Sequence, residues 1–155
     1  MWQSLNGLRR LRKHPNDKTV LFVCVENVGR SQMAEGFFRK YAPRGYVTLS
    51  AGTKPFGDIN PLAIEVMKEV GIDISNQKPK DLTEDMMRNS TKIVNMGCMD
   101  KSFCPTLFIP HLIDWRIEDP KGKPIEKVRG IRNDIDRKVR QLAAELAKDS
   151  MQANL

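Results

Sequence analysis

Three residues in the segment VLFVCVENVGRSQMAEGFF have the types and the spacing for chemistry on an anion. Cys24 ends an apolar run, Arg30 follows six residues later, and Ser31 comes next. A thiolate is a strong nucleophile, and the pKa of a thiol falls near an arginine and a helix N-terminus. A guanidinium can hold two oxygens of a tetrahedral oxyanion, and a serine hydroxyl can donate to the sulfur. The pattern predicts that Cys24 attacks a bound oxyanion.

The residues between Cys24 and Ser31 are predicted to surround that anion. They would connect a strand to a helix that begins near Arg30, where backbone N–H groups and the helix N-terminus favour negative charge. A glycine in such a loop allows the backbone to approach the ligand closely. The alternative is a buried strand cysteine followed by a helix-capping serine. The predicted substrate-binding residues are Val25, Glu26, Asn27, Val28, Gly29, Arg30 and Ser31.

A second group of thiols lies in MGCMDKSFCP, which contains Cys98 and Cys104 and follows an apolar run. A thiol there can attack the sulfur of Cys24 and leave a disulfide. If residues 98–104 were helical, six steps would separate the two Cα atoms by about 9 Å, whereas a disulfide needs them within about 7 Å. We therefore expect this segment to change conformation on oxidation. The alternatives are that both cysteines are packing residues, or that they hold a metal, which three cysteines and two poorly placed histidines disfavour.

A candidate acid lies in IEDPKGKP, where Glu118 and Asp119 precede Pro120. A carboxylic acid on a loop can protonate the oxygen that leaves a phosphoryl or arsenyl centre. The alternative for an Asp-Pro pair alone is turn formation. Neither His14 nor His111 is placed to act as a catalyst.

The elements that must position these residues follow from the apolar periodicity. Apolar and β-branched runs alternate with helical patterns, which predicts a single-domain α/β fold with a four-stranded parallel sheet and helices on both faces. Ligands bind at the carboxyl ends of such strands, where Cys24 would lie. The predicted strands are 19–25, 46–52, 91–96 and 111–115, and the predicted helices are 31–42, one from Asn60-Pro61 to a stop at Gly71, a short one opened by Thr83, and 125–146.

Composition indicates one soluble domain, because the chain has 155 residues with 40% hydrophobic and 29% charged side chains. The net charge of +7 is concentrated near the N-terminus, in a stretch without a nucleic-acid-binding motif or an apolar core typical of a secretory signal. No apolar run is long enough to span a membrane. Three cysteines without a signal peptide favour the cytoplasm. We divide the chain into a basic N-terminal extension (1–18), a catalytic domain (19–149) and a C-terminal tail (150–155).

The chain resembles the low-molecular-weight protein tyrosine phosphatase superfamily. VLFVCVENVGRSQMAEGFF matches its phosphate-binding loop, and LSAGTKP, INPLAIEVMKEVGIDISNQKPKDL and IDWRIEDPKGKP match further blocks in the family's order. The resemblance covers most of the chain from Thr19 onward and is greatest to the thioredoxin-coupled arsenate reductases. It implies that Asp119 is the general acid, that Cys98 attacks Cys24, and that Cys104 completes a Cys98–Cys104 disulfide that thioredoxin reduces.

The expected function is therefore arsenate reduction, with arsenate or phosphate as the bound oxyanion. Arg30 and the loop backbone would hold the oxyanion, and an external thioredoxin-like reductant would replace any bound cofactor. The runner-up is a phosphatase that acts on phosphotyrosine, phosphoarginine or small phosphomonoesters through a phosphocysteine. A non-enzymatic thiol sensor or arsenite-binding protein is a third alternative. We expect no nucleic-acid or membrane partner.

Three departures from the family bear on the pocket. Gly29 stands where many relatives have a second loop cysteine, and Lys121 stands where tyrosine phosphatases have an aromatic residue that stacks on the substrate ring. Glu26 places a negative charge in an anion-binding loop, so we expect it to face solvent or a basic side chain.

A further departure concerns a cation. In some relatives potassium binds near residues that match Asn27, Glu35 and Ser50, together with an aspartate. Lys80 stands where that aspartate would be, and its ammonium group can replace the ion, so we expect no required metal.

Overall fold

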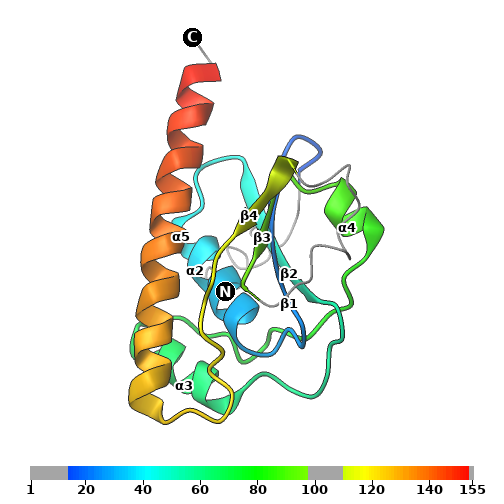
Figure 1. Ribbon diagram of the computed structural model, residues 1–155. Coiled ribbons are helices and arrows are strands. Elements are labelled where there is room, and N and C mark those ends of the chain that lie inside the picture. Colours follow the sequence, from blue (N-terminus) through cyan, green and yellow to red (C-terminus); the bar gives the residue numbers. More distant parts are fainter. Residues whose placement is uncertain (1–13, 98–109, 154–155) are drawn as a thin grey trace, which may run out of the picture.

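The computed structural model describes residues 14–97 and 110–153. In these residues, helices separate β1 from β2 and β2 from β3, and a long helix follows the last strand (Figure 1). The elements are β1 (Lys18–Cys24), α2 (Arg30–Tyr41), β2 (Tyr46–Gly52), α3 (Pro61–Glu69), α4 (Glu84–Arg88), β3 (Lys92–Asn95), β4 (Leu112–Asp114) and α5 (Ile125–Ala153).

The sheet is parallel throughout, with strand order β2-β1-β3-β4. β1 therefore lies inside the sheet and pairs with both β2 and β3. Its buried apolar sequence suits that place, because an inner parallel strand is covered on both faces. The predicted four-stranded parallel sheet is confirmed. β3 and β4 are shorter than predicted, and α5 is longer and continues past residue 149.

Helices cover both faces of the sheet, as predicted. α2, α3 and α5 pack on one face and α4 on the other (Figure 1). Phe22 lies in the larger core, where its ring centroid is 5.9 Å from those of Phe38 and Trp115. Leu21 points to the opposite face and packs in the smaller core with Met87 of α4. The alternation of side chains along β1 therefore builds both cores.

The helix ends follow local chemistry. Asn60 Oδ1 accepts from the backbone N–H of Leu62 at 3.0 Å, and Pro61 opens α3. Gly71 has φ +80° just after this helix. Thr83 Oγ1 accepts from the N–H of Met86 at 3.1 Å and caps α4. These three boundaries were predictable because a cap needs only neighbouring residues.

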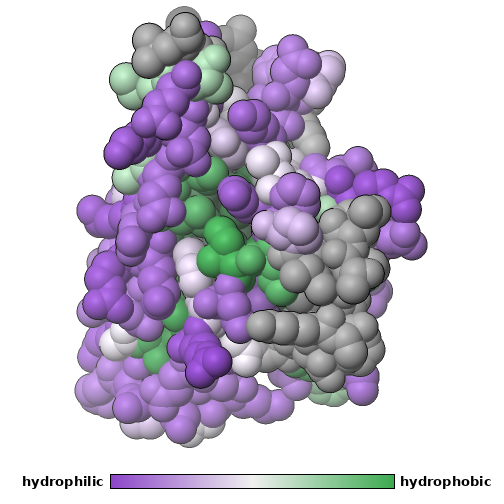
Figure 2. Space-filling view, turned by 45° about the horizontal axis from the view of Figure 1, so that its top comes forward, coloured by the Kyte–Doolittle hydropathy of each residue, from purple (hydrophilic) through white to green (hydrophobic). Residues whose placement is uncertain are grey.

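Hydrophilic side chains dominate the face of the molecule in Figure 2, and hydrophobic residues gather in a strip beside α5. Within the described ranges, no helix combines the length and the apolar character needed to cross a bilayer.

Candidate active site

Cys24 is the last residue of β1, at the carboxyl edge of the sheet. It is 4% exposed, and the loop of residues 25–29 leads from it into α2. α2 begins at Arg30, where the helix was predicted to begin at about Arg30-Ser31, and Gly29 precedes it without a side-chain cap. Its first-turn N–H groups therefore remain available for an anion.

Two donors lie at the sulfur. The backbone N–H of Asn27 donates to Cys24 Sγ at 3.1 Å, and Ser31 Oγ lies 2.8 Å from the same atom. Asn27 Nδ2 donates to Ser31 Oγ at 2.7 Å, which leaves the Ser31 hydroxyl proton for the sulfur. Hydrogen bonds to the charged form favour the thiolate. Ser31 is fully buried and does not line the cavity, so the structure places its hydroxyl group against the Cys24 sulfur and not at the cavity surface, where we had predicted it.

Asn27 shapes the loop. Its φ of +57° is in the left-handed region, where a non-glycine residue needs support from its surroundings. Its side-chain oxygen accepts from Gln32 Nε2 at 3.1 Å and from the backbone N–H of Lys80 at 2.9 Å. The residue is fully buried. Gln32, which our sequence analysis did not single out, therefore helps to hold the loop.

The acid loop (residues 117–121) faces this loop. Arg30 Nη1 donates to the carbonyl oxygen of Ile117 at 2.8 Å, and Arg30 Nη2 lies 3.6 Å from Asp119 Oδ2. The Arg30 side chain is 11% exposed, whereas that of Asp119 is 58% exposed. The fold thus brings together the predicted anion-binding arginine and the predicted acid, with the carboxyl group open to a ligand.

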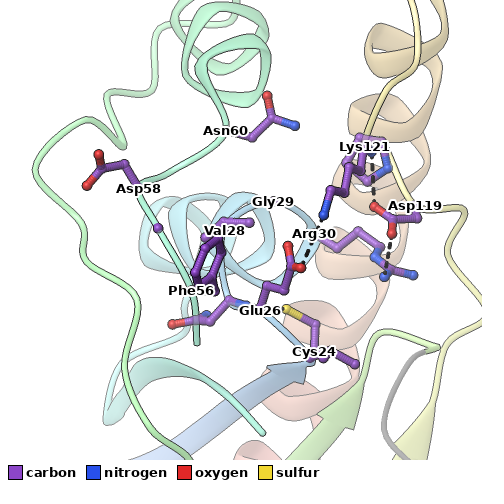
Figure 3. A pocket seen from close by; sticks show the side chains of 14 residues that line it. Cys24, Glu26, Val28, Gly29, Arg30, Phe56, Asp58, Asn60, Asp119 and Lys121 are labelled. Carbon is purple, nitrogen blue, oxygen red and sulfur yellow. Dashed lines mark hydrogen bonds and ion pairs between the residues drawn. The ribbon is translucent and has the colours of Figure 1, made fainter. Parts of the chain in front are cut away.

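These groups meet in one cavity of about 550 Å³ (Figure 3). Cys24 lies at its floor, the loop residues line one side and the acid loop lines another. The cavity also has walls that the sequence did not indicate, from the segment after β2. The lining residues are Cys24 to Arg30, Phe56, Gly57, Asp58, Asn60 and Asp119 to Lys121. Phe56 is 77% exposed at this site, and an unusually exposed aromatic residue is not recognisable from sequence alone.

Glu26 and Lys80, two of the charged residues that depart from the family pattern, lie where we expected them. Glu26 Oε1 lies 3.2 Å from Lys121 Nζ, so the carboxylate in the loop faces a basic side chain. Lys80 Nζ lies 4.0 Å from the buried Glu35 Oε2, which also accepts from Ser50 Oγ at 2.6 Å. The ammonium group therefore lies beside the carboxylate where we expected it to replace an ion.

Cys98 and Cys104 lie outside the described residues. The residues that precede them continue β3 toward the edge of the sheet where Cys24 lies. The N–H of Met96 donates to the carbonyl oxygen of Val23 at 3.0 Å, and Gly97 has φ +104°. The predicted conformational change between residues 98 and 104 stays a prediction. His14 and His111 are exposed and line no wall of the Cys24 cavity.

Comparison with known proteins found one matching family and similar arsenate reductases and phosphatases. A family model described as low molecular weight phosphotyrosine protein phosphatase matches residues 19–152. An arsenate reductase of Brevibacillus brevis is 36% identical over 130 residues, which is 83% of this chain and 96% of that protein. A thioredoxin-dependent arsenate reductase of Corynebacterium glutamicum has a TM-score of 0.71 at 33% identity and covers 99% of this chain and 74% of its own. The YwlE arginine phosphatase of Geobacillus stearothermophilus has a TM-score of 0.79 at 25% identity and covers 87% and 96% of the two chains.

Proposed function

This chain belongs to the low molecular weight phosphotyrosine protein phosphatase family, and within that family we propose that it is an arsenate reductase. The observation that carries the proposal is the cavity where Cys24, Arg30 and Asp119 meet, at the edge of the sheet toward which β3 leads the chain before Cys98. The arsenate reductases among its relatives support the choice of substrate. Arsenate and phosphate are both tetrahedral oxyanions, so the same loop and Arg30 would bind either.

In the first step, the Cys24 thiolate attacks arsenic while Arg30 and the N–H groups of the loop hold the oxyanion. A sulfur–arsenic bond forms and an arsenic–oxygen bond breaks. Asp119 gives its proton to the departing oxygen, which leaves as water. We assign these roles to the residues because their side chains converge on one cavity.

In the second step, the Cys98 thiolate attacks Cys24 Sγ. A disulfide forms, the sulfur–arsenic bond breaks, and its electron pair stays on arsenic, which leaves as arsenite. Two thiols are thereby oxidised by two electrons and As(V) is reduced to As(III). Cys104 then attacks the Cys98 sulfur, which releases Cys24 as a thiolate. A thioredoxin-like dithiol reduces the Cys98–Cys104 disulfide, so the reaction needs no bound cofactor. The cytoplasm, where thiols stay reduced, is the proposed setting.

Arsenate turnover with thioredoxin tests this function in four variants. Cys24→Ser should abolish turnover. Cys98→Ser should abolish turnover but keep the hydrolysis of aryl phosphates, because only reduction needs the second thiol. Cys104→Ser should release one equivalent of arsenite and stop at a Cys24–Cys98 disulfide, which mass spectrometry detects. Asp119→Asn should lower turnover by about 10²–10⁴-fold. Arsenate reduction that continues without Cys98 would contradict the relay, and full activity without Asp119 would contradict the acid assignment and favour a binding or sensor role.

Phosphatase activity is the second candidate, because the cavity is larger than a single oxyanion needs. Its volume of about 550 Å³ lies within the range of about 300–1,000 Å³ for pockets that hold organic ligands. Phe56 and Asp58, from the segment after β2, also line the cavity, and the resemblance to an arginine phosphatase supports an organic substrate. A kcat/KM for a phosphoarginine or phosphotyrosine peptide above that for arsenate would make hydrolysis the main activity.

A further inference from the structure

Two ion pairs join the acid loop to residues 25–30, which we call the oxyanion-binding loop and whose last residue, Arg30, also begins α2. Each segment supplies one basic and one acidic side chain. Arg30 of the oxyanion-binding loop pairs with Asp119 of the acid loop at 3.6 Å. Lys121 of the acid loop pairs with Glu26 of the oxyanion-binding loop at 3.2 Å. The proposed mechanism gives a role to each side chain of the first pair and to neither side chain of the second. Figure 3 shows the Lys121 side chain extending from the acid loop to the Glu26 carboxylate.

Lys121 is joined to the acid as well. Its backbone N–H donates to Asp119 Oδ1 at 3.0 Å, while its side chain reaches Glu26. Pro120 lies between Asp119 and Lys121 and close to Gly29, the residue before α2. A Cβ atom added to Gly29 would lie only 3.2 Å from Pro120 Cγ. A restraint on the Lys121 side chain is therefore transmitted through two residues of backbone to the Asp119 carboxyl group.

The Lys121–Glu26 ion pair is exposed and therefore weak enough to form and break readily. The side chains of Lys121 and Glu26 are 71% and 34% exposed. Exposed pairs of this kind shift an equilibrium by a factor of about five at most, and salt screens them. Such a pair favours the closed loop, yet it still lets the loop open for substrate entry and product release.

We propose that Glu26 and Lys121 form a latch that holds the acid loop against the oxyanion-binding loop and thereby positions Asp119 over the leaving oxygen. Both are positioning residues, since they act through Asp119. The proposal rests on the proposed function only in the step that it shares with the phosphatase reaction, which is proton donation by Asp119.

Charge reversal and charge exchange test the latch. The variants are Lys121→Glu, Glu26→Lys, and the double variant that carries both changes. The control is Lys123→Glu, which makes the same change two residues away, in a residue that pairs with Glu118 at 3.6 Å and does not line the cavity. The readout is kcat/KM for phenyl phosphate and for p-nitrophenyl phosphate, because phenoxide needs protonation on leaving far more than p-nitrophenoxide does.

Each single charge reversal should lower kcat/KM for phenyl phosphate about three- to tenfold. The reversal removes an attraction that favours the closed loop by a factor of about five at most, and it adds a repulsion between like charges. The kcat/KM for p-nitrophenyl phosphate should fall less. The ratio of kcat/KM for phenyl phosphate to kcat/KM for p-nitrophenyl phosphate should therefore fall. The double variant should restore that ratio to within twofold of wild type, and the control should leave it unchanged. In hydrogen exchange, the Lys121 amide should exchange faster in both single variants and recover in the double variant.

A ratio that the double variant fails to restore would overturn the latch. Equal losses for both substrates would also overturn it and would make Lys121 a direct anion ligand. Neither aryl phosphate reaction involves Cys98 or Cys104. If wild type did not reduce arsenate while the ratio behaved as expected, the reductase function would fail and the latch would stand.

Discussion

At the scale of single residues, the reactivity of Cys24 depends on a short chain of hydrogen bonds. Lys80 N–H donates to Asn27, whose amide group donates to Ser31, whose hydroxyl group lies 2.8 Å from the sulfur. Each member is a neutral group, so the chain stabilises a thiolate without introducing a charge that competes for the substrate. The donor farthest from the sulfur, Lys80, comes from a different part of the chain.

Ser31→Ala should slow the alkylation of Cys24 by iodoacetamide at neutral pH about tenfold, because a hydrogen bond to a charged group is worth about 1.5–3 kcal/mol. Mass spectrometry of the modified residue gives the rate. Ser90→Ala is the matched control, since Ser90 is a buried serine whose hydroxyl donates to the carbonyl oxygen of Met86, away from the site. An unchanged alkylation rate in Ser31→Ala would mean that the loop N–H groups alone stabilise the thiolate.

At the scale of elements, the close approach of β2 to the oxyanion-binding loop depends on a glycine. A Cβ atom added to Gly52, the last residue of β2, would lie 2.4 Å from the carbonyl oxygen of Val25 and 3.0 Å from Asn27 Cβ. The end of one strand thus sets the position of the loop that follows its neighbour.

Gly52→Ala should displace the loop and weaken phosphate binding more than tenfold, as measured by calorimetry, because the clash is with backbone that cannot rotate away. Gly130→Ala is the matched control. Gly130 lies within α5 and has no neighbour within 4 Å of an added Cβ atom, so the change should raise stability by up to about 1 kcal/mol through helix propensity. Normal phosphate binding by Gly52→Ala would contradict the role of this contact.

A second contact between elements ties α3 to α5. Glu69 accepts from Arg129 Nη2 and Arg132 Nη1, each at 2.8 Å. Arg132 is almost fully buried and also donates to the carbonyl oxygen of Val66. The hydrogen bond from Arg129, followed by that from Arg132, lowers the pKa of Glu69 below its ordinary value of 4.5.

This lowered pKa predicts a pH dependence of stability. The unfolded chain protonates Glu69 more readily than the folded one, so the contribution of Glu69 is complete above its ordinary pKa and is lost as pH falls through the lowered value. The difference in the free energy of unfolding between wild type and Glu69→Gln should therefore be constant from pH 7 to about pH 5 and shrink at lower pH. Urea denaturation across this range measures it, and a difference that persists unchanged to pH 3 would contradict it.

At the scale of the whole molecule, two cores on opposite faces of the sheet hold β1 in place, and β1 carries the nucleophile. The larger core joins β1 to three helices, and the smaller joins it to α4. Cys24 itself belongs to the larger core. Stability of that core and placement of the sulfur are therefore linked.

Phe22→Ala should lower the free energy of unfolding by about 3–5 kcal/mol, because a fully buried ring between Phe38 and Trp115 leaves a cavity. Leu49→Ala, on the edge strand β2 and 36% exposed, should cost much less. Denaturant titration compares the two. Equal losses would mean that the core around Phe22 relaxes to fill the space.

The sequence by itself determined the elements and the reactive loop. Strand β1 follows from an uninterrupted apolar run, the ends of α3 and α4 follow from Asn60 and Thr83, and the loop follows from Cys24, Arg30 and Ser31 within eight residues. These features depend on neighbours in the chain, and local periodicity and capping chemistry report them directly. The roles of Cys98 and Cys104, and the absence of a required metal, stay predictions.

Only the tertiary structure decided which distant side chains meet. It set Lys80 against Asn27, Phe56 beside the cavity, and Lys121 rather than another basic residue against Glu26. Such contacts depend on strand order, on register and on the paths of loops across the sheet edge. A residue's own neighbourhood in the sequence carries none of that information, because the free energy that selects these contacts comes from burying the two cores of the whole chain.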